Sequence, residues 1–548
     1  MSNVLLGELI AGGMFVVTIF VIMIGYPVAF TLAGTGLIFA WIGSMTGVLD
    51  FHLFTGLASR YFGIMINEIL VAVPLFVFMG VMLERSKIAE ALLTTMGQLF
   101  GAMRGGLGIS VILVGGLLAA STGIVGATVV TMGLLSLPAM MRAGYDPKLA
   151  SGIICASGTL GQIIPPSTVL IFMGDMLQGA NQQAQLAMGN FAFAPVSVGQ
   201  LFAGAMIPGI TLVFLYVAWV LVKAIFHPSS CPAIQMTAAE RAGLLRNVFV
   251  ALVPPLILIF TVLGSILSGI ATATESASVG AVGAMLMAAM RGRLSFKIVN
   301  EVMLATVKIS SMVFVILLGA SVFSLTFRGL GGEQVVHDML SAMPGGQVGA
   351  VIAVMLLTFV LGFFLDTFEI IFIIVPITAA PLIMLGVDPI WLGVALGVNL
   401  QTSFLTPPFG FALFYLRGVA SRVLDTMAIY RGVVPFIGLQ VVGIVLIWLI
   451  PGMATWLPER LFAPGPPAAV VITPRAEGGF GDLFGGGQQQ QPGGESQDGQ
   501  DGFGDLFGSP GGGQAAPQPE SAPAGQPEGQ PAGEPEGEDD FQDLFKSQ

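Results

Sequence analysis

The sequence is poor in charged residues. Only 9% of its 548 residues are Asp, Glu, Lys or Arg, whereas 55% are hydrophobic, and the mean hydropathy is +0.89. A soluble domain carries about 25% charged residues, so this composition excludes a soluble globular protein. Apolar runs recur from Leu5 to Leu457, many of them near the ~20 residues that a bilayer-spanning helix needs. We expect an all-α polytopic membrane protein with roughly ten to twelve spans.

Residues and motifs that support other chemistry are also scarce. The two cysteines, Cys155 and Cys231, are too few for a disulfide framework, and Cys155 falls in an apolar run where we expect it to pack. The three histidines, His52, His227 and His337, fall in predicted loops without the spacing of metal ligands. The chain has no G-x-x-x-x-G-K-[ST] phosphate-binding loop and no basic region before its first apolar stretch. We therefore expect no enzymatic activity and no cleaved signal peptide.

The last part of the chain has a different composition. From Gly465 onward it is rich in Gly, Pro, Gln and Ala, and it contains fourteen acidic but only two basic residues. Such a segment cannot bury enough apolar surface to fold, so we predict a disordered tail over 461–548 after a membrane domain over 1–460. The tail is either a spacer with drifted duplications or a multivalent docking segment. Its three short repeats are FGDLF at 480–484, FGDLF at 503–507 and FQDLF at 541–545.

The membrane region contains an internal repeat. GYDP at Gly144–Pro147 is matched by GVDP at Gly386–Pro389, and the Pro-Pro pair at 165–166 is matched by a pair at 407–408. The offset is 242 residues in both cases. Two spaced motifs with one offset are unexpected by chance, so we infer a duplication.

The same offset aligns two polar stretches, Ser121–Thr128 and Phe363–Ile370, each between apolar runs that are too short to span a membrane. This pattern is typical of a re-entrant helical hairpin with a polar tip. We predict inverted repeats over about 50–225 and 290–457, each with one re-entrant hairpin and one helix broken at its Pro-Pro pair. The Lys and Arg residues support the inversion, because the basic loops then all face the cytoplasm.

The paired helix breaks indicate a transporter. Proline inside a helix removes a hydrogen bond, and irregular backbone within a membrane is tolerated where protein or a water-filled cavity satisfies it. The segments before the breaks, Ser157–Gln162 and Asn399–Ser403, are polar and lack Lys and Arg. Their oxygens suit a hard cation such as sodium, while half-helix N-termini suit an anion. The alternative is that the prolines only kink packing helices. A channel is disfavoured because a continuous polar pore is missing.

Two acidic residues have a structural interpretation. Glu275 follows Thr272 by three residues, which is the spacing of a capping box at a helix start. Glu369 lies one turn after Asp366, where we expect it to cap a half-helix.

Residues 106–152, 156–176 and 364–394 closely resemble one family, the large membrane subunit of tripartite ATP-independent periplasmic (TRAP) transporters. Ala271–Ala281 also resembles that family's Thr-Pro-Thr-Glu-Ala helix start, with Ala273 in place of proline. In two places the sequence departs from the family. The linker Gln178–Pro195 is longer than the usual join, and the acidic tail is an addition.

The resemblance implies sodium-coupled secondary uptake of an organic acid, with proton coupling through Asp366 as the alternative. It implies an elevator movement, in which hairpins and broken helices form a transport domain that moves against a scaffold. The implied partners are a small four-helix membrane subunit, a periplasmic substrate-binding protein, the organic acid and membrane lipid, but no nucleic acid. The implied location is the bacterial inner membrane, and sodium is the coupling ion with no other cofactor.

Carried over to this sequence, the substrate and ion site includes the hairpin tips and the segments around both breaks. Its residues are Ser121, Thr122, Gly123, Ser157, Gly158, Thr159, Pro165, Pro166, Asp366, Thr367, Asn399, Thr402, Pro407 and Pro408. Sodium is expected near five of these, namely Ser157, Gly158, Thr159, Asn399 and Thr402.

The distribution of basic residues predicts that Arg291–Lys297 is cytoplasmic and that the tail after Pro458 is periplasmic. Single cysteines placed at Gly292 and Gly485 in a cysteine-free background should therefore react oppositely with an impermeant thiol reagent added to intact cells. Labelling of both positions from outside would overturn this topology.

Overall fold

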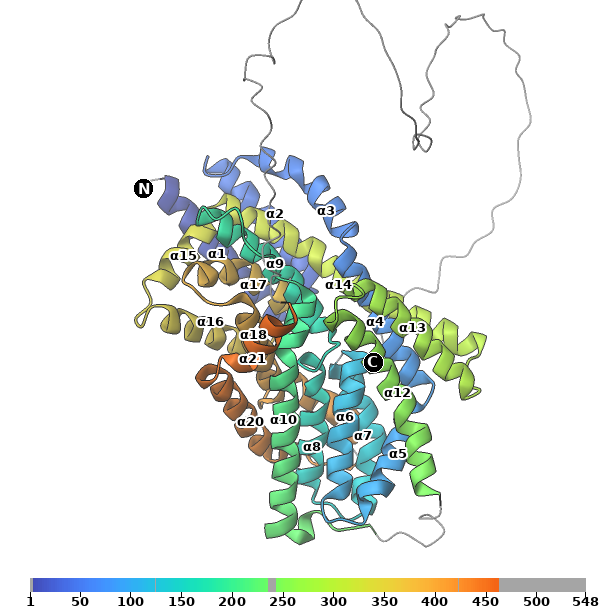
Figure 1. The fold of residues 1–548 in the computed structure, drawn as a ribbon. Coiled ribbons are helices and arrows are strands. Elements are labelled where there is room, and N and C mark those ends of the chain that lie inside the picture. The colour runs from blue at the N-terminus through green and yellow to red at the C-terminus, as the bar shows by residue number, and fades with distance from the viewer. Residues whose placement is uncertain (1–2, 124, 235–242, 422, 463–548) are drawn as a thin grey trace, which may run out of the picture. The chain divides into compact units, whose positions relative to one another are not determined.

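The computed structural model describes residues 3–123, 125–234, 243–421 and 423–462, apart from the side chains of residues 119–122 and 245. Within these ranges the chain forms twenty α-helices and no strand. The expected all-α class is confirmed (Figure 1). The predicted tail lies almost wholly outside the described residues, so its disorder and its boundary stay predictions.

The helices are separated by short connections, and three single 3₁₀ segments occur among them. The helices are α1 (Asn3–Ile24), α2 (Val28–Met45), α3 (Leu57–Met65), α4 (Glu68–Arg85), α5 (Ile88–Gly101), α6 (Gly106–Thr122), α7 (Val125–Arg142), α8 (Pro147–Thr159), α9 (Thr168–Ala187), α10 (Val198–Phe226), α12 (Leu244–Leu267), α13 (Ala273–Met290), α14 (Phe296–Gly329), α15 (Gly332–Ser341), α16 (Gln347–Leu361), α17 (Thr367–Met384), α18 (Pro389–Leu405), α19 (Phe411–Ala420), α20 (Thr426–Leu449) and α21 (Gly452–Leu461). The 3₁₀ segments are η1 (Phe51–Gly56), η2 (Leu160–Gln162) and η3 (Pro228–Ser230).

Among the described residues, nine helices are long and apolar enough to cross a membrane, and the bent pair that joins Phe51–Met65 to α4 makes a tenth. This count lies at the lower end of the expected range. The difference arises because α16, α18, α19 and the apolar part of α6 have only 10–17 residues. By contrast, α7 and α17, which we expected to be hairpin arms, reach the spanning length. The chain is a multi-pass membrane protein.

The prediction that all three histidines lie in loops was wrong for two of them. His337 lies in α15 and His52 lies in η1, whereas His227 follows the end of α10. The segments α15 and η1 have only 10 and 6 residues, so their sequences show little hydrophobic periodicity from which a helix could be predicted. The capping box at Thr272 and Glu275 is confirmed, since each side chain accepts a hydrogen bond from the backbone N–H of the other.

Packing separates most of the helices into two groups. In the first, which we call the α14 group, α14 packs on α2 and α4, α13 packs on α4 and α12, and α1 packs on α2. In the second, which we call the α8 group, α8 packs on α6, α7 and α20, α9 packs on α17, and α18 packs on α16 and α20. Figure 1 shows α6, α7 and α8 of this group as neighbouring helices, with α10 beside them. The groups meet where α4 lies against α6 and α9 and where α14 lies against α17.

Glycines allow the closest backbone contact within the α8 group. A Cβ atom on Gly152 of α8 would overlap the carbonyl oxygen of Gly432 in α20, and a Cβ on Gly432 would overlap the carbonyl oxygen of Lys148. Small residues at such crossings let membrane helices gain dispersion contacts that longer side chains would prevent. The α8–α20 crossing therefore depends on both glycines.

Gly432→Ala should destabilise the protein, because the added methyl group has no room at this crossing. We expect the free energy of unfolding to fall by about 1–3 kcal/mol, the usual range for overpacking. The matched control is Gly438→Ala, since Gly438 lies in the same helix with no atom within 4 Å of the added Cβ. Thermal unfolding of the purified protein in detergent measures both variants. Equal melting temperatures for the two variants would contradict this account.

Candidate functional site

The first break interrupts the helix that starts at Asp146. The Asp146 side chain accepts a hydrogen bond from the backbone N–H of Lys148, and α8 then runs to Thr159. A single 3₁₀ turn, η2, follows, and α9 starts only at Thr168. The Pro165–Pro166 pair lies in the interval, where neither residue has an N–H to donate.

The second break has the same local pattern. The Asp388 side chain accepts a hydrogen bond from the backbone N–H of Trp391, and α18 runs to Leu405. The Pro407–Pro408 pair follows, and α19 starts at Phe411. Both Pro-Pro peptide bonds are cis. An aspartate cap, a buried helix and a Pro-Pro break thus recur in the same order in both halves.

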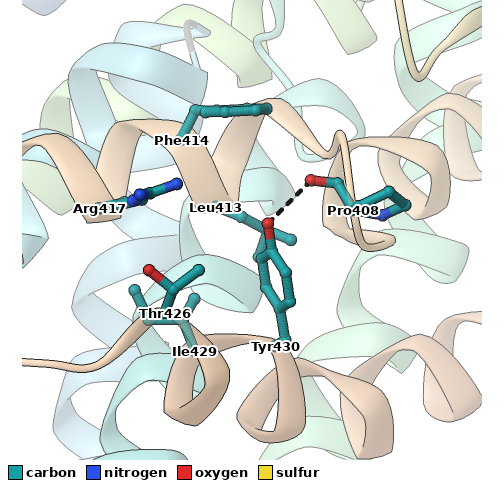
Figure 2. Close-up of a pocket in the computed structure, with 7 residues that line it drawn as sticks. All are labelled: Pro408, Leu413, Phe414, Arg417, Thr426, Ile429 and Tyr430. Carbon is teal, nitrogen blue, oxygen red and sulfur yellow. Dashed lines mark hydrogen bonds between the residues drawn. The ribbon is translucent and has the colours of Figure 1, made fainter.

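A shallow pocket beside the second break shows how one freed backbone group is satisfied (Figure 2). The Tyr430 hydroxyl of α20 donates a hydrogen bond of 3.1 Å to the Pro408 carbonyl oxygen. That carbonyl is therefore engaged by the protein. The pocket is lined by Pro408, Leu413, Phe414, Arg417, Thr426, Ile429 and Tyr430.

The two predicted hairpin tips are both junctions between packed helices. At the first, α6 is followed by Gly123, whose φ of +62° is in the left-handed region that glycine tolerates. The side chains of Ser121 and Thr122 lie outside the described part of the structure, so their predicted roles stay predictions. At the second, α16 ends at Leu361 and α17 begins at Thr367.

Direct hydrogen bonds join the first break to both tips. The Thr168 hydroxyl donates to the Gly123 carbonyl oxygen at 3.0 Å. The Gln162 side-chain amide donates to the Thr367 hydroxyl oxygen at 2.8 Å. The first contact lies within one half, and the second links the break of one half to the tip of the other. Gly123, Gln162 and Thr367 therefore belong to one packed region.

The second break is joined to the second hairpin by Asn399. Its side-chain nitrogen donates to the Met355 carbonyl oxygen at 2.8 Å and to the Thr358 hydroxyl oxygen at 2.9 Å, both in α16. These bonds use the amide nitrogen and leave the amide oxygen for another partner. Glycine again permits the approach, because a Cβ on Gly362 would overlap the Ser403 hydroxyl oxygen.

Three predicted site hydroxyls have committed their protons to their own helices. Ser157 donates to the Ile154 carbonyl, Thr159 to the Ala156 carbonyl, and Thr402 to the Val398 carbonyl, over 2.8–3.1 Å. All three hydroxyls are buried. A hydroxyl whose proton is used in this way keeps oxygen lone pairs, which accept from a donor or coordinate a cation. Gly158 between them is needed for packing, since a Cβ there would overlap Val129.

Two carboxylates gather at the second tip. Asp366 accepts from the backbone N–H of Thr367 at 2.8 Å, and Glu369 accepts from the backbone N–H of Asp366 at 2.9 Å. The predicted capping role of Glu369 is confirmed. Among the described residues, no ion pair involves either acid. The positive end of α17 is thus occupied by its own side chains.

Sequence reasoning missed three side chains that hold these elements together. Gln162 falls within the polar segment before the first break, and Thr168 is the first residue of the half-helix after it, so both positions carried some signal. Thr358 lies inside an apolar run of α16 and carried none. The two broken helices also contact each other directly, since α18 packs against both α8 and η2.

Comparison with known proteins identifies the family. Residues 15–453 match the DctM component of tripartite ATP-independent periplasmic transporters. The chain belongs to this family. The C4-dicarboxylate TRAP transporter large permease protein DctM of Vibrio cholerae is 26% identical over 476 residues, which cover 82% of this chain and 98% of that protein. The ectoine TRAP transporter large permease protein TeaC of Halomonas elongata is 25% identical over 449 residues, covering 80% and 97%. These relatives are transporter permeases and not enzymes.

The fold has a counterpart among solved structures. The YdaH transporter of Alcanivorax borkumensis has a TM-score of 0.54 with 15% sequence identity, covering 74% of this chain and 89% of that one. At this identity the likeness concerns the fold alone. The TRAP family membership rests on the sequence matches.

Gly123→Ala should impair uptake more strongly than it impairs folding. The added Cβ would lie 2.8 Å from the Thr168 hydroxyl and 2.9 Å from its backbone nitrogen, at a φ that other residues rarely adopt. Gly189→Ala is the matched control, because Gly189 has a φ of +76° with no atom within 4 Å. We expect uptake per molecule to fall about tenfold or more for Gly123→Ala, equivalent to at least ~1.4 kcal/mol, and to change little for the control. Similar losses in both variants would mean that backbone strain alone is responsible.

Proposed function

We propose that this chain is the large permease subunit of a sodium-coupled TRAP transporter that takes up an organic acid across the bacterial inner membrane. The observation that carries the proposal is the set of buried polar groups at two helix breaks. The first break is hydrogen-bonded to both hairpin tips and the second to the α16 arm, and these segments contain no Lys or Arg. Relatives are named for C4-dicarboxylates, sialic acid and ectoine, so an organic acid is the substrate class.

The charge distribution supports cation coupling. Hydroxyls and amide oxygens are the groups that a hard cation prefers, and Asp366 and Glu369 add carboxyl oxygens at the same place. A bound cation favours the ionised form of a carboxyl group and offsets its repulsion of an organic anion. Sodium bound near Ser157, Gly158, Thr159, Asn399 and Thr402 supplies this charge. Proton coupling through Asp366 is the alternative.

We further propose that α6–α7 and α16–α17 are re-entrant hairpins. With 17 and 15 residues, α6 and α16 extend about 23–26 Å at 1.5 Å per residue, short of the ~30 Å hydrocarbon core. On this proposal the α8 group moves as an elevator against the α14 group. Two hydrogen bonds between the α8 group and the α14 group would then break and re-form as the α8 group moves. Asn67 of α4 donates to Asp175 of α9 at 2.9 Å, and Thr131 of α7 donates to Glu84 of α4 at 3.1 Å.

The long linker Gln178–Pro195 has a place in this scheme. Its first part extends α9 to Ala187 and brings Gln183 to the ends of α14 and α15. There Arg328 donates to the Gln183 amide oxygen at 2.8 Å, the Gln183 amide donates to Glu333 at 3.0 Å, and Arg328 and Glu333 form an ion pair. This extension therefore adds a third state-dependent contact, on the side that we assign to the periplasm.

The family also supports two protein partners, a small four-helix membrane subunit and a periplasmic binding protein that delivers the acid. The permease itself is surrounded by membrane lipid, and we propose no nucleic-acid partner for it.

Uptake into proteoliposomes containing the permease and its small subunit tests this proposal. We expect transport to need inward sodium and the cognate binding protein together, without ATP. Asn399→Ala should raise the sodium concentration for half-maximal uptake, because it frees α16 from α18 and removes an amide oxygen. It should leave the affinity for the binding protein nearly unchanged. If potassium replaces sodium without loss, and a proton gradient suffices, the sodium assignment fails and Asp366 becomes the leading proton carrier.

A further inference from the structure

In the described part of the chain, Gln162 has an unsatisfied side-chain oxygen, as do Gln401 in α18 and Gln440 in α20. Gln162 lies at the end of η2, inside the first break, and is only 1% exposed. Its side-chain nitrogen donates to Thr367, and its backbone carbonyl oxygen accepts from the Ser167 hydroxyl at 3.1 Å. Its side-chain oxygen has no hydrogen-bond partner among the described residues. A buried carbonyl oxygen without a partner is costly, so a ligand that supplies one is favoured.

The amide orientation in the structure pairs the Gln162 nitrogen with the Thr367 hydroxyl oxygen and leaves the Gln162 oxygen without a described partner. A side-chain amide oxygen only accepts hydrogen bonds or coordinates a cation. The group at this position therefore presents an oxygen to whatever binds there.

The surroundings favour a cation over an anion at this oxygen. Thr367, which Gln162 contacts, lies between Asp366 and the first turn that carries Glu369. No Lys, Arg or His occurs in residues 147–168 after Lys148, or in residues 338–416. The backbone N–H groups of Asp366 and Thr367 at the start of α17 are engaged by the Glu369 and Asp366 carboxylates. A cation would find carboxylate, hydroxyl and amide oxygens here, and no basic side chain in these stretches opposes it.

We propose that the Gln162 side-chain oxygen is a ligand of a second coupling cation, between the first break and the second hairpin tip. This inference rests on the proposed sodium coupling and adds a cation position that spans the two halves, distinct from the one near Ser157–Thr159 and Asn399. A cation bound to the Gln162 oxygen withdraws electron density from the amide. The amide N–H then becomes a stronger donor, which strengthens its hydrogen bond to Thr367. Binding of the cation therefore fastens the break of one half to the tip of the other.

The test compares two substitutions in the full chain reconstituted with its small subunit. Gln162→Met keeps an unbranched side chain of similar size but removes the oxygen. We expect it to raise the sodium concentration for half-maximal uptake about tenfold or more, with a smaller change in the organic-acid concentration for half-maximal uptake at saturating sodium. Gln162→Glu retains oxygen ligands and should recover most of the sodium response. A purely structural role predicts equal losses in both variants and would overturn the proposal.

A second readout does not depend on transport. Sodium, compared with potassium, should raise the melting temperature of the purified protein, because a ligand that binds only the folded state stabilises it. This shift should be reduced in Gln162→Met. Ser310→Ala is the control, since Ser310 is also a buried polar residue whose side chain lacks a partner but lies in α14, outside the α8 group. It should keep the full sodium shift.

The outcomes separate this inference from the proposed function. A wild-type protein with no sodium response in either assay would overturn both. A normal wild-type response that persists unchanged in Gln162→Met would overturn this inference alone. If Gln162→Met weakens only the response to the organic acid, Gln162 contacts the substrate and the cation assignment is wrong.

Discussion

The structure depends on one constraint, which is that backbone polar groups inside a membrane must find partners within the protein. A Pro-Pro pair in a helix frees such groups, and the chain supplies partners locally. Ser167 donates to the Gln162 carbonyl at the first break, and Tyr430 donates to the Pro408 carbonyl at the second. Each broken helix also begins with an aspartate that caps its first free N–H groups. The breaks are therefore stable features of the fold, and the polar atoms that remain unpaired are few and specific.

Close backbone packing brings these polar groups together. Lipid tails are as apolar as helix surfaces, so helices in a membrane gain stability from tight contact and internal hydrogen bonds more than from the hydrophobic effect. Gly152 and Gly432 allow α8 and α20 to approach at backbone distance, and Gly123 allows the first tip to reach Thr168. A larger residue at Gly123 would overlap Thr168 at the first tip, and larger residues at Gly152 or Gly432 would separate α8 from α20. Small residues at these positions therefore support the packing around the polar site.

The sequence predicted the all-α fold and the positions of both breaks, because Pro-Pro and Asp-Pro act on the backbone at their own positions. It also predicted the capping role of Glu369, which depends on a spacing of three residues. It did not predict that Gln162 meets Thr367, since that contact joins residues 205 positions apart and depends on how η2 packs on the second hairpin. The contact between Thr358 and Asn399 could not be predicted for the same reason. Local chemistry is readable in one sequence, whereas partners across a fold are set by packing.

Electrostatics links the site to its proposed coupling. Two unit charges 4 Å apart interact by about 4 kcal/mol at an effective dielectric constant of 20, and by more in a drier interior. Asp366 and Glu369 have no basic partner among the described ion pairs, so an ionised carboxylate at the second tip would oppose the approach of an organic anion. A bound cation attracts the anion and so offsets part of that repulsion. Anion and cation then favour each other's binding, and reciprocity follows from linkage, because each ligand must raise the affinity of the other by the same factor. On the proposed coupling, uptake then requires that the site carrying both ligands moves more readily than the site carrying one.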